Sequence, residues 1–323
     1  MKNFFTIYFF SISLFSAAQQ WDWAKAVATN LPVSTDVSPL QLVSDKYGNF
    51  YLGYFYWDSN YGCPDGSMVA KFDSNGNQLW QKNFTSKIRV RGIACDSDGV
   101  LYMTGDFRDT AYFDNAALVS AGNNDAFIVK YDAGGQVQWI KRSGGTYNDC
   151  GGGLCLDKEG NIYMTGEYSD SALFYGNWIS DNISNLTISK FDPSGNLLLY
   201  KTSDTPDSLQ GYASGESIKL DRSGNMVVLG SYSHVKIDTA RLDNGGPYGA
   251  QFLCKLDTAG DLKWLKGATS FTDKYHDFFI ADDDAFYAAG GGSWTNGTWT
   301  ITNKLDPTGN ILWHQACGLH CGY

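Results

Sequence analysis

A short motif recurs five times along this chain. An Asp, two variable residues and a Gly precede an apolar run that itself ends in Gly. The copies begin at Asp45, Asp96, Asp157, Asp221 and Asp282, and the last copy has lost the first Gly. Successive copies start 51, 61, 64 and 61 residues apart. Self-similarity at such a period is the signature of repeat architectures, whose units bury their apolar faces against their neighbours.

The second half of each unit is equally regular. A Lys, an aromatic residue or Leu, and an Asp are followed by a turn and a strand that carries a Trp or Tyr. The Lys and aromatic positions are Lys71 with Trp80, Lys130 with Trp139, Lys190 with Tyr200, Lys255 with Trp264, and Lys304 with Trp313. The segments 192–196 and 306–310 read Asp-Pro-Ser/Thr-Gly-Asn, a strong hairpin signal. We expect a Lys-to-turn ion pair or hydrogen bond in every unit.

Each unit supplies four short apolar runs without a helical pattern between them, as at 90–95, 100–105, 126–131 and 136–141. This pattern predicts an all-β fold, a β-propeller of four-stranded blades. The repeated Trp residues should pack between blades. A sixth copy of the fourth-strand motif, Trp23-Ala-Lys25, leaves two blade counts open. We favour five blades, and six is the alternative.

The first 18 residues have the features of a secretory signal peptide. Lys2 is followed by an apolar stretch from Phe4 to Phe15 and by the small residues Ser16-Ala-Ala18. The sequence therefore predicts a signal peptide over 1–18, a single propeller domain over 19–323 and an exported protein, extracellular, on the cell surface or periplasmic. No later apolar run is long enough to span a bilayer as a helix. The net charge of −10 and the lack of a basic cluster disfavour nucleic acid as a partner.

The repeat resembles the SBBP-type β-propeller repeat of exported bacterial proteins, especially those of the Bacteroidetes. The segments 157–166, 125–132 and 195–200, with their equivalents, carry the resemblance over nearly the whole chain after residue 18. It implies a propeller at the cell surface or outside the cell and implies no particular activity.

Export makes disulfides permissible for the seven cysteines. The close pairs Cys150 with Cys155 and Cys317 with Cys321 are candidates for local bridges. Cys95, Cys155 and Cys254 lie in predicted strands, where a free thiol is a small apolar side chain.

Aromatic residues that do not follow the repeat form the candidate binding site. Their flat apolar faces suit a sugar ring, and neighbouring Asp or Asn would supply hydrogen bonds. The candidate ligand-binding residues are Tyr54, Tyr56, Trp57, Trp178, Trp294 and Trp299.

No catalytic residue and no metal site is assigned. Calcium is an alternative at turns such as 73–76 and 96–99, although neither continues as an EF-hand. The sequence favours a non-catalytic binding or scaffolding protein whose partner is a glycan or an envelope protein. The alternative is a polysaccharide hydrolase or lyase with carboxylates in the central channel.

Overall fold

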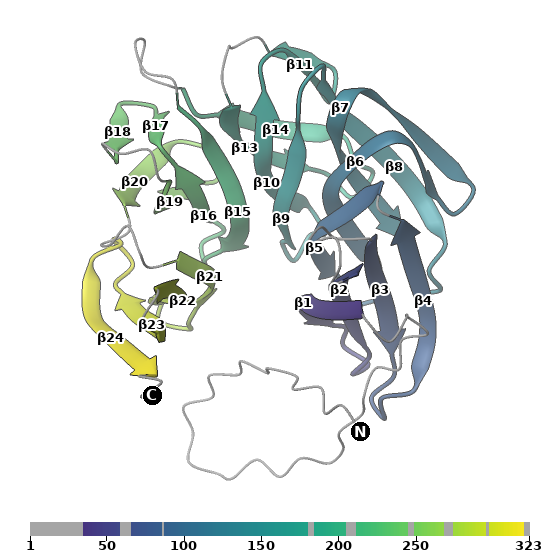
Figure 1. Ribbon diagram of the computed structural model, residues 1–323, viewed down its shortest axis with the longest axis horizontal. Helices are drawn as coiled ribbons and strands as arrows, with labels where there is room; N and C mark the ends of the chain where they lie inside the picture. The colour runs from purple at the N-terminus through teal and green to yellow at the C-terminus, as the bar shows by residue number, and fades with distance from the viewer. Residues whose placement is uncertain are drawn as a thin grey trace.

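A computed structural model describes residues 35–58, 66–85, 87–179, 184–204, 211–244, 249–267, 274–294 and 297–319. Over these residues the chain forms strands and turns, with no helix. Five antiparallel sheets stand around a central axis, in chain order from the purple to the yellow end of the ribbon (Figure 1). The protein is a five-bladed β-propeller, as the repeat predicted. The signal peptide predicted over 1–18 and the repeat copy at 23–25 lie outside the described residues.

Each blade is a four-stranded meander whose first strand is innermost. The innermost strands are β1 (Thr35–Ser44), β5 (Ile88–Cys95), β9 (Cys150–Leu156), β15 (Ala213–Leu220) and β21 (Lys274–Ile280). The second strands are β2 (Phe50–Asp58), β6 (Leu101–Phe113), β10 (Ile162–Ser169), β16 (Met226–Tyr232) and β22 (Phe286–Trp294). The third strands are β3 (Gly66–Phe72), β7 (Ala116–Tyr131), β13 (Ser184–Phe191), β19 (Ala250–Leu256) and β23 (Gly297–Leu305). The outer strands are β4 (Gln78–Thr85), β8 (Val137–Gly145), β14 (Leu197–Thr202), β20 (Leu262–Gly267) and β24 (Ile311–Leu319).

The repeated Asp residues build the turns at one end of the blades, which we call the turn end. Asp221 is typical: its carboxylate accepts hydrogen bonds from the backbone N–H groups of Ser223 and Asn225 and from the Asn225 amide, at 2.8–2.9 Å. Gly224 takes the left-handed conformation at φ 80°, which costs Gly least. The Asp-x-x-Gly-Asn letters therefore describe a self-bonded turn.

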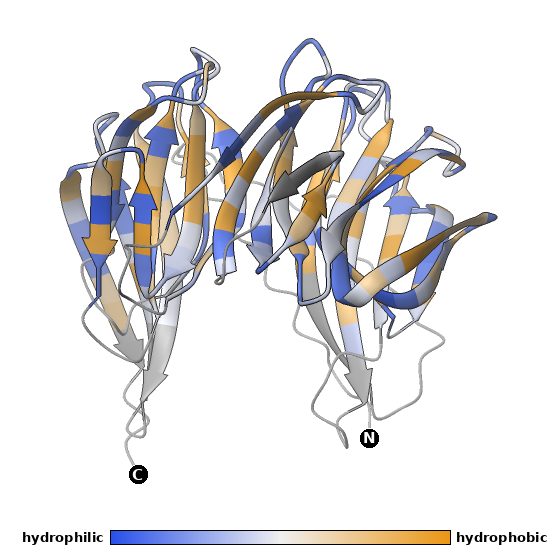
Figure 2. Ribbon diagram, turned by 90° about the horizontal axis from the view of Figure 1, so that it is seen from above, coloured by the Kyte–Doolittle hydropathy of each residue, from blue (hydrophilic) through white to orange (hydrophobic). Residues whose placement is uncertain are grey.

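The core is made where the middle strands of neighbouring blades face each other. Every residue of β3 is buried, from Gly66 to Phe72, so both faces of this strand are covered. Coloured by hydropathy, the strands are largely orange along the middle of the blades, while many connecting turns are blue (Figure 2). A lone blade would expose one of its apolar faces, so the blades are stable only as a stack.

Trp80, Trp139 and Trp264 pack between blades, as expected, whereas Trp313 of the last blade is 41% exposed and departs from the expectation. The Trp80 indole N–H donates to the Ala133 carbonyl in the next blade at 3.2 Å. Trp139 and Trp264 make the equivalent bonds to the Pro193 and Pro307 carbonyls. Each ring lies over the Gly of the turn that it contacts: a Cβ placed on Gly135, Gly195 or Gly309 would lie 3.0–3.2 Å from the ring. We call this contact the blade joint.

The third blade corrects the assignment of Tyr200 to this position. Leu199, not Tyr200, pairs with Lys190, just as Trp80 pairs with Lys71. Leu199 covers Gly260 of the next blade, whereas Tyr200 turns to the opposite face and packs on Phe174 at 4.5 Å. Because side chains alternate along a strand, an error of one residue reverses the face.

The extra length of the middle units lies between the second and third strands. In the second blade β6 and β7 extend into a long hairpin. In the third blade the insertion forms β11 (Ala172–Phe174) and β12 (Asn177–Ile179), and β11 pairs with β8 of the preceding sheet. In the fourth blade the insertion forms a hairpin of β17 (His234–Ile237) and β18 (Ala240–Asp243). Ion pairs join two of these insertions to the preceding outer strand, Lys82 to Asp114 at 2.7 Å and Lys201 to Asp238 at 2.5 Å. The insertions therefore strengthen contacts between neighbouring blades.

The expected Lys contact is present in each blade with local variation. Lys71, Lys190 and Lys255 lie 3.8, 3.8 and 2.7 Å from the Asp that opens the first turn of their blade. Lys304 pairs with Asp283 at 3.9 Å instead. Lys130 donates to the Pro193 carbonyl of the next blade at 2.9 Å. The repeated Lys is thus a structural residue.

The candidate disulfide between Cys150 and Cys155 is not formed, and the alternative of free thiols holds. Both thiols are free, because the two residues lie at opposite ends of the extended strand β9 and pair with Glu167 and Tyr163 of β10. Cys317 is free as well, and Cys321 lies outside the described residues. Cys95 and Cys254 are free thiols in strands, as expected.

Candidate functional site

Every innermost strand carries a β-bulge or register shift at a similar height. In four blades one residue of the innermost strand is left without a partner in β2, β6, β16 or β22: Leu40, Arg91, Glu216 and His276. In the third blade the shift takes in Gly152 and Gly153 of β9. Bulges bend a strand and re-aim a side chain, often beside functional sites.

The bulges also explain the Gly that closes each second-strand run. A Cβ on Gly105 would meet the Arg89 carbonyl oxygen, and a Cβ on Gly166 would meet that of Cys150. Gly230 is crowded in the same way by the Ser214 carbonyl oxygen. In these three blades the Gly is required because the backbone of the bulged innermost strand lies directly against it.

The residue after this Gly is not repeated. It is Tyr54, Asp106, Glu167 and Ser231 in the first four blades. In the second blade the Asp106 carboxylate bonds the Arg91 guanidinium at 2.5 Å. Asp106 is only 5% exposed, whereas 37% of the Arg91 side chain is exposed. Arg91 also lies close enough to Glu167 of the third blade for the carboxylate charge to favour the charged guanidinium.

Glu167 continues this group toward the fourth blade. It is half-buried, and burial raises the pKa of its carboxyl, although hydrogen bonds from Ser184 and Ser214 and the charge of Arg91 act in the opposite direction. Burial likewise raises the pKa of the Cys150 thiol to about 12, so this Cys is not an activated nucleophile.

Glu216, on the bulge of β15, accepts a hydrogen bond from the Gln251 amide at 3.0 Å. Gln251 also donates to the Tyr275 carbonyl of the last blade at 2.9 Å. Burial raises the pKa of Tyr212, and the charges of Glu216 and Glu167 raise it further, which places this Tyr near both carboxylates. We call Arg91, Asp106, Glu167, Tyr212 and Glu216 the channel cluster.

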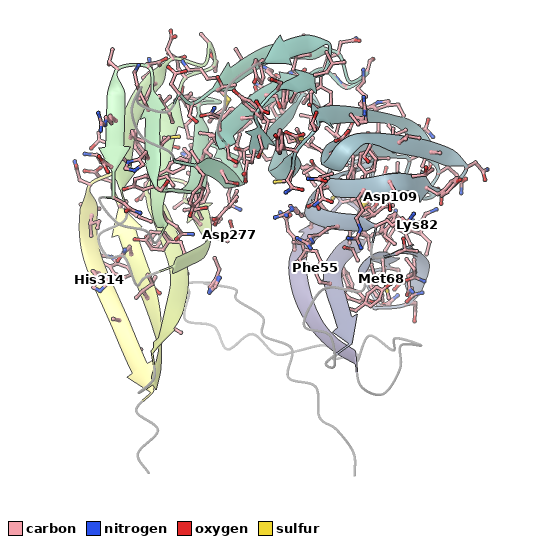
Figure 3. The ribbon with its side chains drawn as sticks, turned by 45° about the horizontal axis from the view of Figure 1, so that its top comes forward. Phe55, Met68, Lys82, Asp109, Asp277 and His314 are labelled. Carbon is pink, nitrogen blue, oxygen red and sulfur yellow. The ribbon has the colours of Figure 1, made fainter. Side chains whose placement is uncertain are left out.

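A second set of polar residues continues along the innermost strands. Asp277 of β21 accepts from Ser217 at 2.9 Å and from Lys219 at 3.0 Å, both on β15. Figure 3 shows Asp277 on the side of the last blade that faces the middle of the molecule, while His314 lies on its outer strand. The bulges and inner strands of the second to fifth blades therefore carry charged and hydrogen-bonding side chains.

The structure separates the aromatic residues predicted to bind a ligand. Tyr54 is 2% exposed and belongs to the core, and the Tyr56 hydroxyl donates to the Phe84 carbonyl at 3.0 Å. The backbones of Trp57, Trp294 and Trp299 lie at the loop end of β2, β22 and β23, opposite the turn end. Trp178 lies on β12, radially outside β8. The side chains of these four Trp residues are outside the described part of the structure.

The turns proposed for calcium use their carboxylates internally. Asp73 accepts from the N–H groups of Asn75 and Asn77 and from the Asn77 amide at 2.8–2.9 Å. Asp96 accepts from the N–H groups of Asp98 and Val100 at 2.9 Å. Within the described ranges no three His, Cys, Asp or Glu side chains are grouped closely enough to hold a metal ion.

The channel cluster was not predicted from the sequence, although a signal was available. Gly105-Asp106 and Gly166-Glu167 place a carboxylate directly after a repeated Gly, at a position where the other blades differ. Only the bulges show that these positions face a neighbouring innermost strand.

Comparison with known proteins adds little to this description. No family model matches the chain. An alignment over 192 positions, which covers 51% of this chain, gives 27% identity to an uncharacterized WD repeat-containing protein of Acanthamoeba polyphaga mimivirus. It covers 14% of that protein's length.

Among solved structures, a Bacteroides caccae protein of unknown function matches at TM-score 0.47 and 10% identity, over 87% of this chain and 82% of the other. A putative gluconolactonase matches at TM-score 0.42 and 13% identity, over 87% and 81%. No helix in the described part of the chain could span a membrane.

Proposed function

We propose that this protein is a non-catalytic binding or scaffolding propeller that works outside the cytoplasm, at the cell envelope or beyond it. The features of residues 1–18 support export, and so does the resemblance to the SBBP-type repeat. On this proposal the ligand is a glycan or another polar molecule rich in hydroxyl groups, and it binds at the channel cluster.

One observation carries this proposal. The repeated residues have structural contacts, as turn bonds, blade joints or Lys pairs, whereas the channel cluster breaks the repeat with different polar side chains at equivalent positions. Carboxylates and Tyr hydroxyls are suited to accept and donate hydrogen bonds to sugar hydroxyls. The Trp57 and Trp294 backbones lie at the loop end of their blades, and aromatic residues are suited to bind a sugar ring.

The test is a glycan array probed with residues 19–323, followed by titration calorimetry on any ligand that binds. We expect Glu167→Gln to weaken binding at least about tenfold, since a charge-assisted hydrogen bond contributes roughly 1.5–3 kcal/mol. Trp57→Ala should weaken it as well. The control is Glu159→Gln, which changes an exposed carboxylate in a turn. Equal affinity in the Glu167 and Glu159 variants would exclude the channel cluster as the site.

The environment of Glu167 favours one alternative, a polysaccharide hydrolase. Burial raises the pKa of this carboxyl, as a general acid requires, and Glu216 on the next innermost strand offers a second carboxylate. A hydrolase would release reducing ends from a polysaccharide, and Glu167→Gln would abolish the release. Saturable binding without new reducing ends would instead support the binding protein.

A further inference from the structure

The outer strand of the last blade, β24, is the edge of its sheet. It pairs with β23 from Trp313 to Leu319 without a bulge, so this part of the strand is regular. Within the described part of the chain no strand pairs with its other side, and Figure 1 shows β24 at the outside of the molecule. The backbone N–H and C=O groups that point away from β23 can therefore pair with a further strand.

The outer strands of the other blades have neighbours or charges at this edge. The insertion of the following blade reaches β4 through the ion pair of Lys82 with Asp114, and β8 through its pairing with β11. The insertion of the fourth blade reaches β14 through the ion pair of Lys201 with Asp238. β20 carries two exposed lysines, Lys263 and Lys266. Edge lysines oppose pairing between like strands because their charges would meet.

The strand β24 has no such charge. From Ile311 to Leu319 it contains no Lys, Arg, Asp or Glu. The difference is local to one position of the repeat, two residues after the Trp or Leu that pairs with the repeated Lys. The last blade has Gln315 there, and the other blades have Lys82, Lys141, Lys201 and Lys266.

The side chains of β24 are also uncovered. Every residue from Ile311 to Cys317 is exposed, and Leu312 and Trp313 are 58% and 41% exposed. Trp313 stands at the position that forms the blade joint in the first, second and fourth blades. A regular, exposed and apolar edge strand of this kind readily recruits another strand.

We infer that β24 pairs antiparallel with β24 of a second copy of this chain, so that two last blades form one continuous sheet. Antiparallel pairing of a strand with its own copy obeys two-fold symmetry, the commonest symmetry of soluble oligomers. The strand suits this arrangement because it has no Lys, Arg, Asp or Glu to meet a like charge across the axis. Pairing would also remove part of the exposed apolar surface of Leu312 and Trp313 from water.

Sedimentation of residues 19–323 tests the pairing, with a reducing agent present because the Cys317 thiol is free and exposed. The mean mass should rise toward twice that of the monomer as the protein concentration increases. Gln315→Lys should weaken association at least about tenfold, because it places two like charges beside the axis. The control Gln138→Lys adds the same charge at an exposed position of β8 and should associate as the wild type does. A wild-type protein that stays monomeric, or equal association of the wild type and Gln315→Lys, would overturn the inference.

Hydrogen exchange locates the contact. In the wild type, amides within 311–319 should exchange more slowly at high than at low protein concentration, whereas in Gln315→Lys they should not. A dimer whose β24 amides lack this dependence joins through another surface. Slow exchange of these amides in a monomer would instead mean that another segment of the same chain covers the edge. Either result contradicts the pairing.

The charge variant is expected to fold, since Lys occupies the equivalent position of the other four blades. Thermal denaturation at a concentration where the wild type is monomeric checks this, and the two proteins should then unfold at similar temperatures. The pairing does not involve the channel cluster, so it can fail without affecting the proposed function.

Discussion

The two ends of the blades follow opposite rules. At the turn end, Asp-x-x-Gly turns bond to themselves and blade joints repeat the same contacts from blade to blade. Toward the other end, the bulges carry Arg91, Glu216 and His276, and the second strands carry Asp106 and Glu167. A residue that recurs in every unit has a structural role that every unit shares, such as packing or forming a turn. Function has to be sought where the units differ.

The largest expected effect is at a blade joint. Trp139→Ala should lower the free energy of unfolding by about 3–5 kcal/mol, because it leaves a cavity over Gly195 and removes the bond to Pro193. Trp313→Ala is the matched control, since this Trp is 41% exposed. In urea denaturation, Trp313→Ala should lower the free energy of unfolding clearly less than Trp139→Ala does. If Trp139→Ala and Trp313→Ala lowered the free energy of unfolding equally, the blade joint would not be the source of the stability that Trp139 contributes.

The two ends should respond to pH in opposite directions. At the loop end, burial raises the pKa of Asp149 to about 7, and the nearby charges of Asp125 and Glu167 act in the same direction. Hydrogen bonds from the N–H groups of Ser169 and Gly145 oppose this rise. At the turn end, bonds from Thr308 and Asn310 lower the pKa of Asp306 to about 2.

A raised pKa means that the folded state binds more protons than the unfolded chain between about pH 4 and pH 7. Asp149 therefore reduces stability as pH rises through this window, by an amount on the order of a few kcal/mol. Asp306 has the lowered pKa and stabilises the fold above about pH 4, an effect lost as pH falls toward 2. Asp149→Asn should flatten the decline between pH 4 and 7 in denaturation curves, and Asp306→Asn should leave that decline in place.

The Lys contacts should differ in strength between blades. Lys255 lies 2.7 Å from Asp221, and their side chains are only 11% and 2% exposed. Lys255→Met should cost roughly 2–3 kcal/mol, because Asp221 would remain buried without its cation. Lys130→Met removes a bond to a carbonyl and should cost about 1 kcal/mol. Thermal denaturation of both variants checks the order, and the reverse order would refute this account.

The smallest effect is expected at the cysteines of β9. Cys155→Ala should cost about 1 kcal/mol, the loss of a small half-buried group, and not the 2–5 kcal/mol that follows loss of a native disulfide. Thiol alkylation of the unreduced, denatured protein should label both Cys150 and Cys155. A 150–155 disulfide detected by mass spectrometry would contradict the strand geometry.

The sequence by itself determined the all-β class, the four strands of each blade, the turns and the Trp joints. These features rest on local chemistry, such as an Asp that bonds its own turn, and on periodicity that survives in every unit. Strand register is not visible in the sequence: the aromatic Tyr200 was assigned to the repeated position, whereas Leu199 is the residue that pairs with Lys190. The same limit applied to Tyr54, whose ring is buried against the prediction of a binding platform.

Only the tertiary structure decided the channel cluster. Arg91 on the innermost strand β5 and Glu167 on the second strand β10 are 76 residues apart in sequence, and they approach because neighbouring blades converge on the axis. The glycines of β9 permit this convergence, since a Cβ on Gly152 would collide with the Gly215 carbonyl oxygen of the next blade. Local residue patterns specify blades, whereas the site is formed where blades meet, and that proximity exists only after the blades have stacked.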